Sequence, residues 1–497
     1  MLRKIRIILA TIFFAGVTLL FLDFTGTLHA WLGWMAKVQF LPAVLAMNFA
    51  VVAALLLLTL LFGRVYCSVI CPLGIMQDII SWIHGKTKKK NRFRFSYSPA
   101  KKWLRYAVLA LFVLGLVLGA HSIAVIIAPY SAYGRIAGNL FAPVYQWGNN
   151  FFAWIAERAG SYAFYSVDVW IKSVSTFIIA AVTFIVIAAL AWKHGRTWCN
   201  TICPVGTFLG FFSRFSVFAP VIDTEKCRDC GLCGKQCKAS CINTKEHEID
   251  YSRCVACMDC IDTCKDGAIS FARRRSTGKP ASQAKSQTDK GRRAFIVSTA
   301  IAGTAVAAKA QEMKVDGGLT DISHAEKPER KTPLVPAGSL SLKNFADHCT
   351  SCQLCVSVCP NQVLRPSTSL MTFMQPEMSY ERGYCRPECT RCSDICPAGA
   401  IRPISIEEKS SIQIGHAVVN LDICVVNTDE VSCGNCARHC PAGALMMVRK
   451  NPDDSKSLMI PTVNEERCIG CGACENLCPA RPLTAIHVEG HEVHKTI

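Results

Sequence analysis

Acidic residues are scarce in this sequence, and much of its basic charge is gathered in a few places. Its 497 residues include 36 Asp and Glu against 54 Lys and Arg, a formal net charge of +18. Four short stretches, Arg3–Arg6, Lys86–Arg105, Lys193–Arg196 and Arg273–Arg293, carry 22 of the basic residues and a single acid, Asp289. Each borders a long apolar segment, as positively charged cytoplasmic loops do. A nucleic-acid partner, which a basic chain can otherwise indicate, is therefore not expected.

The chain also lacks the Cys-x-x-Cys-His motif that attaches haem, so its cysteines need another explanation. It contains 29 of them, and 51% of its residues are hydrophobic. That composition excludes a disordered protein and an ordinary cytosolic enzyme. A mean hydropathy of +0.27 favours a membrane protein, and the many cysteines add a metal site to that expectation.

Four apolar stretches are about as long as the 20 residues that cross a bilayer core of about 30 Å. They are Ile5–Leu22, Leu41–Phe62, Trp103–Ala128 and Val174–Trp192. A soluble helical core would need polar faces, which these stretches lack. The segments that join them on one side, 23–40 and 129–172, contain one and three Lys or Arg, so both ends of this four-helix unit should lie in the cytoplasm.

A fifth apolar stretch, Ala294–Ala308, is short and diluted by Ser and Thr, but the residues before it change its interpretation. The segment from Gly291 to Ile296, with Arg292-Arg293 at its centre, resembles a twin-arginine export signal. It predicts that residues 311–497 lie in the periplasm, with either cleavage near Ala310 or a retained anchor. The alternative is one more basic loop before a soluble helix.

Twenty-four cysteines fall into six groups of four with one spacing theme. The first two groups follow the spacing by which bacterial ferredoxins hold [4Fe–4S] clusters, where three cysteines hold one cluster and the fourth reaches the neighbouring one. We therefore predict two clusters with exchanged fourth ligands. Their ligands are Cys227, Cys230, Cys233 and Cys264 for one cluster, and Cys254, Cys257, Cys260 and Cys237 for the other. Lys238 and Lys265 stand where proline usually follows the fourth cysteine.

The C-terminal part repeats the theme four times, and each fourth cysteine is followed by proline. Sixteen thiolates suffice for four further [4Fe–4S] clusters, which makes six in all. Spacing does not determine which groups exchange ligands; we expect the outer groups to pair with each other, and the inner groups likewise. The groups are Cys349, Cys352, Cys355 and Cys359; Cys385, Cys389, Cys392 and Cys396; Cys424, Cys433, Cys436 and Cys440; and Cys468, Cys471, Cys474 and Cys478.

Zinc and disulfides are the competing uses of so many cysteines. Zinc sites normally use two separated Cys-x2-Cys pairs, whereas these groups have three stepped cysteines and a fourth, although the first gap widens to three residues after Cys385 and to eight after Cys424. Disulfides suit an exported domain because the periplasm is oxidising. A domain exported after folding would not form these disulfides, since clusters assembled in the cytoplasm would already have used the thiols.

Two further motifs, Cys67-x3-Cys71-Pro and Cys199-x3-Cys203-Pro, follow the second and fourth spans at corresponding places. Both are preceded by Gly-Arg, which indicates an internal repeat of a two-span unit. In a helix the i,i+4 spacing would put both sulfurs on one face, so the two motifs together are a candidate metal centre at the cytoplasmic edge. Buried or reversibly oxidised thiols are an equally good interpretation. Cys241 fits no group and is expected to be a spare thiol.

On these motifs the chain resembles two kinds of protein joined in one. Residues 1–290 resemble the NapH-type membrane quinol dehydrogenases, which share their core with NosR and CcoG-type proteins. Residues 291–497 resemble the NapG/MauM-type exported ferredoxins. The resemblance implies oxidation of menaquinol or ubiquinol from the membrane quinone pool. It also implies electron transfer to a periplasmic molybdenum-containing reductase, such as nitrate reductase, or to a cytochrome c.

A quinol site needs a proton acceptor, and ionisable residues near apolar spans are the candidates. Asp23, His29 and His121 qualify, although capping or packing explains such residues more often. The alternative functions are a membrane redox sensor of the NosR type and a metal-handling or assembly factor of the CcoG type.

The predicted fold is a polytopic α-helical membrane domain of four spans with a fifth anchor, plus two ferredoxin-like α+β domains. The expected boundaries are 1–222 for the membrane domain, 223–272 for a cytoplasmic two-cluster ferredoxin, 273–310 for a basic linker and signal, 311–340 for a linker and 341–497 for a periplasmic four-cluster domain. The protein should lie in the bacterial inner membrane.

Overall fold

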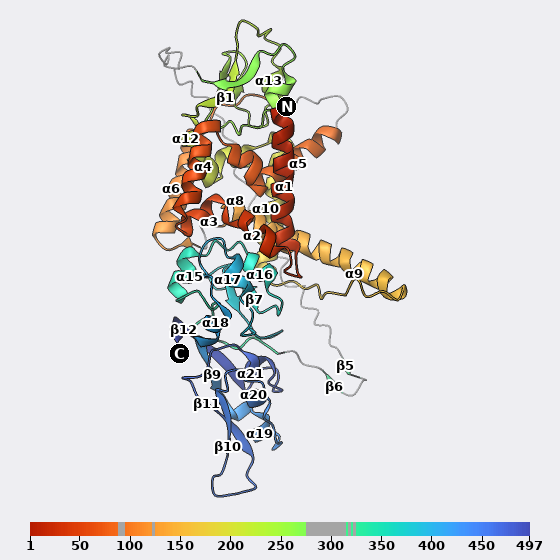
Figure 1. The fold of residues 1–497 in the computed structure, drawn as a ribbon, viewed down its shortest axis with the longest axis vertical. Coiled ribbons are helices and arrows are strands. Elements are labelled where there is room, and N and C mark those ends of the chain that lie inside the picture. The colour runs from red at the N-terminus through yellow and green to blue at the C-terminus, as the bar shows by residue number, and fades with distance from the viewer. Residues whose placement is uncertain (88–94, 122–124, 275–314, 317–319, 322–324) are drawn as a thin grey trace, which may run out of the picture.

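The computed structural model describes residues 1–87, 95–121, 125–274, 315–316, 320–321 and 325–497. Three units follow one another along its long axis (Figure 1). A helical unit, residues 1–217, lies in the middle. A first cysteine-rich unit, residues 218–274, lies at the end where α1 begins, and a second cysteine-rich unit, residues 325–497, lies at the opposite end.

The helical unit contains two helices that are long and apolar enough to cross a membrane, α1 and α10, each of 21 residues. Such a helix is roughly 31 Å long at 1.5 Å per residue, which matches a bilayer core. The described elements of this unit are α1 (Leu2–Leu22), α2 (His29–Lys37), α3 (Phe40–Leu45), α4 (Phe49–Phe62), η1 (Tyr66–Ile70), α5 (Pro72–Thr87), α6 (Lys102–Val117), α8 (Pro129–Ile136), η2 (Ala137–Phe141), α9 (Ala142–Arg158), α10 (Val174–His194), α11 (Thr197–Thr201) and α12 (Pro204–Ser213).

The predicted second and third spans are not single long helices in the described residues. The stretch Leu41–Phe62 is broken between α3 and α4, where Met47 has a φ of 52° and the side chain of Asn48 accepts a hydrogen bond from the backbone N–H of Val51. An Asn at the N-cap starts a new helix. The continuous hydrophobicity of the stretch Leu41–Phe62 gave no sign of this break. The stretch Trp103–Ala128 stops being α6 at Val117, close to Gly119, whose φ of 78° is typical of a residue that ends a helix.

The first cysteine-rich unit is a small α+β fold. Its strands β1 (Phe218–Ile222) and β4 (Ile269–Arg273) pair antiparallel and bring the two ends of the unit together. Between them lie α13 (Leu232–Gln236), the two-stranded pair of β2 (Ile242–Asn243) and β3 (Glu248–Ile249), and α14 (Asp259–Thr263). The short helices α13 and α14 pack against each other, and each ends immediately before a cysteine, Cys237 or Cys264.

The second cysteine-rich unit repeats this pattern on a larger scale. Its central pair joins β9 (Ile412–Val419) to β12 (Ile486–Thr496), so the end of the chain closes the unit. Two further antiparallel pairs are β7 (Leu364–Pro366) with β8 (Pro376–Met378), and β10 (Leu445–Arg449) with β11 (Met459–Val463). The helices are α15 (Leu342–His348), α16 (Leu354–Val358), α17 (Arg391–Ile395), α18 (Ile406–Ser411), η3 (Leu421–Ile423), α19 (Val425–Thr428), α20 (Asn435–Arg438) and α21 (Ala473–Asn476). A short pair outside these units joins β5 (Val315–Asp316) to β6 (Thr320–Asp321).

One buried apolar core runs through all three units. It joins helical residues such as Val17 to Val255 of the first cysteine-rich unit and to Leu354, Val358 and Ile395 of the second. Burial of apolar surface is the main favourable term in such contacts, so both cysteine-rich units are docked on the helical unit rather than tethered to it. The twin-arginine segment, the fifth apolar stretch and the join near Ala310 lie outside the described residues.

Candidate metal centres

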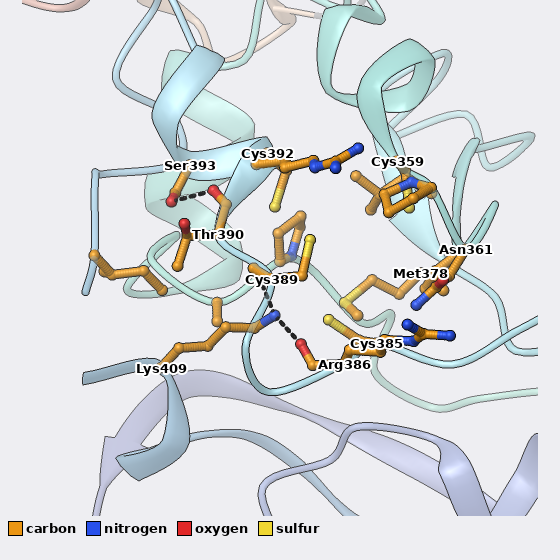
Figure 2. A pocket seen from close by; sticks show the side chains of 17 residues that line it. Cys359, Asn361, Met378, Cys385, Arg386, Cys389, Thr390, Cys392, Ser393 and Lys409 are labelled. Carbon is orange, nitrogen blue, oxygen red and sulfur yellow. Dashed lines mark hydrogen bonds between the residues drawn. The ribbon is translucent and has the colours of Figure 1, made fainter. Parts of the chain in front are cut away.

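Five pockets in the cysteine-rich units are each lined by four of the predicted ligand cysteines. In Figure 2, the labelled sulfurs of Cys359, Cys385, Cys389 and Cys392 face a common space. The other four sets are Cys227, Cys230, Cys233 and Cys264; Cys237, Cys254, Cys257 and Cys260; Cys440, Cys468, Cys471 and Cys474; and Cys424, Cys433, Cys436 and Cys478. Every set therefore takes three cysteines from one motif and one from another.

In the first cysteine-rich unit the two sets are those expected from the exchange of fourth cysteines. In the second unit the expected pairing of outer with outer and inner with inner motifs is wrong. Cys359 of the first motif lines the pocket of the second, and Cys478 of the fourth lines the pocket of the third. Sequence neighbours pair because a short helix within each motif carries its third cysteine, and α16 packs against α17 just as α20 packs against α21.

The remaining four cysteines of the second unit, Cys349, Cys352, Cys355 and Cys396, form the sixth set. Cys349, Cys355 and Cys396 belong to one buried cluster of side chains, and Cys352 interacts electrostatically with Cys349 and Cys396. Of the four sets in the second unit, this one contributes a cysteine, Cys352, to the buried core shared with the helical unit.

The donors fit iron–sulfur clusters better than zinc or disulfides. All 29 cysteines are free thiols. Four sulfurs around one zinc, at Zn–S distances of about 2.3 Å, would lie within about 4 Å of one another. Among the described residues, no three cysteine sulfurs lie mutually within 4.8 Å, so each set is wider than a single zinc requires. Backbone N–H groups also point at these sulfurs, as from Ser351 to Cys349 Sγ at 3.4 Å and from Ala444 to Cys440 Sγ at 3.3 Å. Four spaced thiolates with such donors fit the needs of a [4Fe–4S] cluster.

The structure also brings the two Cys-x3-Cys-Pro motifs together. Cys67, Cys71, Cys199 and Cys203 are all buried, and Cys203 interacts electrostatically with the other three. The repeat extends to its glycines: a Cβ on Gly74 would lie 2.3 Å from the carbonyl oxygen of Cys67, and one on Gly206 would lie 2.3 Å from that of Cys199. Real Cβ atoms do not approach that closely, so each motif needs the glycine that follows its Cys-Pro.

Two arginines of the same repeat hold the motifs in place. Arg196 is fully buried; its guanidinium donates to the carbonyl oxygen of Cys67 and makes two hydrogen bonds of 2.7 Å to the carboxylate of Asp78. Arg64, equally buried, donates to the carbonyl oxygens of Gly206 at 2.8 Å and Cys254 at 3.2 Å. Arg64 therefore links the Cys67 group, by which we mean Cys67, Cys71, Cys199 and Cys203, to the first cysteine-rich unit. The repeated Gly-Arg pairs were the sequence signal for both arginines.

Lys238, where ferredoxins usually have proline, has a docking role. Its ammonium contacts Asp78 of the helical unit at 3.2 Å and Asp259 at 2.8 Å. Burial opposes ionisation of Asp78, but Arg196 and Lys238 outweigh it and hold the pKa of that carboxyl well below its usual range. The first unit is thus fixed to the helices by buried charges. Arg3 of α1 adds an ion pair of 2.9 Å to Asp259.

Cys241 lies beside a cluster site rather than apart from it. Its sulfur is 3.5 Å from that of Cys237, and it lines the pocket of Cys237, Cys254, Cys257 and Cys260. Cys241 therefore neighbours two predicted ligands, Cys237 and Cys254. The sequence alone did not indicate this position.

The proposed quinol-site residues lie near the second cysteine-rich unit. Asp23 Oδ2 is 3.0 Å from His29 Nδ1, while Asp23 also accepts hydrogen bonds from the backbone after α1. The side chain of His29 is buried, with Nδ1 directed at this carboxylate. Burial lowers the pKa of His29, against the effect of Asp23. His121 is elsewhere, 3.7 Å from the carboxylate of Asp347.

Two families match parts of the sequence. One, described as a 4Fe-4S binding domain, matches residues 44–91 and 176–220, the two segments that carry the Cys67 group. The other, described as a 4Fe-4S dicluster domain, matches residues 431–481, where the third and fourth motifs of the second unit exchange cysteines. No solved structure matches the chain.

Several curated proteins are similar to parts of the chain. The methylamine utilization ferredoxin-type protein MauM of Methylobacillus flagellatus is 32% identical over 155 residues, 30% of this chain and 64% of that protein. The protein YccM of Escherichia coli K12 is 26% identical over 254 residues, 49% of this chain and 60% of that protein. The chain thus spans less than two thirds of the length of these two. The ferredoxin-type protein NapG of Escherichia coli K12 is 30% identical over 182 residues, 33% of this chain and 77% of that protein. The chain therefore belongs to the family of ferredoxin-type proteins that includes MauM and NapG, and it is an electron-transfer protein with [4Fe–4S] clusters.

Proposed function

We propose that this protein oxidises a membrane quinol and transfers the electrons to a periplasmic reductase. The observation that carries the proposal is the docking of two cysteine-rich units on opposite ends of one helical unit, which contains two helices long enough to cross a membrane (Figure 1). We infer that the helical unit corresponds to a NapH-type quinol dehydrogenase and the second cysteine-rich unit to a NapG/MauM-type ferredoxin. Six [4Fe–4S] clusters, held by the 24 cysteines of the six sets, would supply one-electron carriers.

The quinol site in this proposal is formed by Asp23 and His29. A quinol gives up two protons with its two electrons, so its site needs a neutral base in a place protected from water. His29 has a buried ring whose Nδ1 faces the carboxylate of Asp23. The site borders the second cysteine-rich unit, because the guanidinium of Arg391 donates to the carbonyl oxygen of Thr25 at 3.2 Å. His29 would take up a proton, and Asp23 would stabilise the imidazolium.

Buried tyrosines connect the Cys67 group to the second cysteine-rich unit. Tyr66 lies against Cys67, Cys71 and Cys203, and its hydroxyl donates to Gln39 Oε1 at 3.0 Å. Tyr130 interacts electrostatically with Cys352 and Cys396 on one side and with Tyr66 on the other. Both side chains are 1% exposed. We infer that this dry, packed connection lets the two cysteine-rich units exchange electrons across the helical unit, and that the Cys67 group is the additional metal centre.

The test uses the full-length chain, purified without oxygen and with its iron content measured. Adding a reduced menaquinol analogue should bleach the cluster absorbance, whereas the oxidised quinone should not. His29→Gln should slow the bleaching by roughly 10²-fold, as expected for loss of a general base. The control variant His194→Gln, at an exposed histidine of the same unit, should leave the rate unchanged. Unchanged absorbance in the wild-type chain with its iron in place would rule out the dehydrogenase.

A further inference from the structure

A buried arginine of the helical unit, Arg135 in α8, lies beside the Cys349, Cys352, Cys355 and Cys396 site and has no carboxylate partner in the described part of the chain. It is 0% exposed. Its guanidinium donates to the carbonyl oxygen of Ile126 at 2.6 Å and, more weakly, to that of Val125 at 3.5 Å, while Nε has no partner. No ion pair within 4.0 Å joins it to any acid among the described residues. The guanidinium interacts electrostatically with Cys352.

Such an arginine is costly unless an anion compensates it. Arginine stays protonated in proteins, and moving a charge out of water costs several kcal/mol even after relaxation. A cluster held by four thiolates carries net negative charge, which supplies the missing compensation. The second cysteine-rich unit shows the same arrangement once more. There the ammonium of the buried Lys409 donates to the carbonyl oxygens of Arg386 and Cys389 at the pocket in Figure 2, and no acid of the described segments pairs with it.

The contact between α8 and the cysteine loop is close and specific. A Cβ on Gly134 would lie 2.3 Å from the carbonyl oxygen of Cys352, so the helix backbone touches the loop directly. One turn further, Asn139 Nδ2 donates to Gln353 Oε1 at 2.9 Å, and both side chains are buried. A second cation of the helical unit, Lys172, donates to the carbonyl oxygen of Val356 at 3.3 Å, between Cys355 and Cys359.

We propose that Arg135 is a positioning residue that raises the reduction potential of the Cys349, Cys352, Cys355 and Cys396 cluster, so that the helical unit completes a site in the second cysteine-rich unit. The inference rests on the cluster assignment within the proposed function. Reduction adds negative charge to a cluster, so a nearby buried cation stabilises the reduced form more than the oxidised form. The charge of Arg135 belongs to the helical unit, whereas the four cysteine ligands belong to the second cysteine-rich unit. The reduction potential of this cluster therefore depends on the docking of the two units.

The experiment is a potentiometric titration of the full-length chain, followed by electron paramagnetic resonance, with iron analysis of every sample. In Arg135→Gln, the signal of one cluster should move to lower potential while the others stay in place. Arg135→Lys, which keeps the charge, should leave that signal near its wild-type potential. Arg158→Gln removes an exposed arginine of the same unit and should change no signal.

The outcomes separate charge from packing. Unchanged potentials in Arg135→Gln with the iron content intact would overturn the inference. Loss of one cluster in Arg135→Gln but not in Arg135→Lys would support it, since the charge is then needed for the site itself. Equal changes in the two variants would overturn it, because shape rather than charge would be the cause. A failure of quinol to reduce the protein would refute the proposed function and leave these potentials measurable with a chemical reductant.

Discussion

At the scale of single residues, substitution is most restricted where the backbone of the helical unit touches the backbone of a cysteine loop. Gly134 is the clearest case, because an added Cβ would meet the carbonyl oxygen of Cys352 at 2.3 Å and the ring of Phe21 at 2.8 Å. The first of these neighbours is backbone in a ligand loop and cannot move cheaply. Nothing in the spacing of the cysteine motifs pointed to α8, since the contact joins residues more than 200 positions apart.

Gly134→Ala should loosen the docking of the second cysteine-rich unit by about 1–3 kcal/mol, the usual cost of overpacking. Amide hydrogen exchange of residues 350–358 should become faster in this variant. The matched variant is Gly138→Ala, where a Cβ would meet nothing within 4 Å and helix propensity would improve slightly. Equal exchange in both variants would show that the close contact does not hold the units together.

At the scale of elements, the chain uses short helices and strand pairs to fix its cysteines, and its C-terminal strand to close the second unit. Strand β12 pairs with β9 over most of its length. Near its end, burial lowers the pKa of His494 to about 4, and His491 adds to the effect. Both ring nitrogens of His494 are buried without a hydrogen-bond partner.

Acidification should therefore weaken the β9–β12 pair. Between pH 6.5 and pH 4 the histidine is protonated in the unfolded chain, where its pKa is about 6.5, but neutral in the folded chain. The stability is therefore present at neutral pH and is lost as the pH falls below about 6.5. The loss should reach about 2 kcal/mol at pH 5. Amide exchange in β12 at pH 7 and pH 5, corrected for intrinsic rates, would measure it.

His494→Gln should remove most of that pH dependence, whereas replacement of the exposed His194 by Gln should not. A pH dependence that persists in His494→Gln would assign the effect to other groups, with His416 and His491 on the same strand pair as the first to test.

At the scale of the whole molecule, the order of the units along the axis agrees with the proposed crossing of a membrane. The basic N-terminus contacts the first cysteine-rich unit through Arg3 and Asp259, and the second unit lies at the far end of α1. Arg274 and Glu326, which border the segment with the twin-arginine motif, belong to opposite ends of the molecule. This arrangement supports the proposed route of electrons between compartments.

A reporter fused after Ile497 should accordingly behave as periplasmic, and one fused before Met1 as cytoplasmic. Replacing Arg292-Arg293 by Lys-Lys should retain the C-terminal reporter in the cytoplasm, because a twin-arginine signal depends on both arginines. The same double change at Arg273-Arg274 is the control and should not alter export. Cytoplasmic behaviour of the wild-type C-terminal reporter would reverse the proposed orientation.

The sequence by itself indicated the iron–sulfur chemistry of this protein, because stepped cysteines limit the choice of cofactor, and it predicted which cysteines of the first unit line each pocket, since two motifs have only each other as partners. It could not determine the pairing in the second unit, since four similar motifs allow several exchanges and only the packing of α16 on α17 selects one. Hydropathy found the apolar stretches but not the break at Asn48, because a helix cap is a local hydrogen bond. The tertiary structure alone decided how Arg135, Tyr130 and Lys238 relate to the cysteine sites. Their charges and rings act through space on residues far away in the chain, where no spacing rule applies.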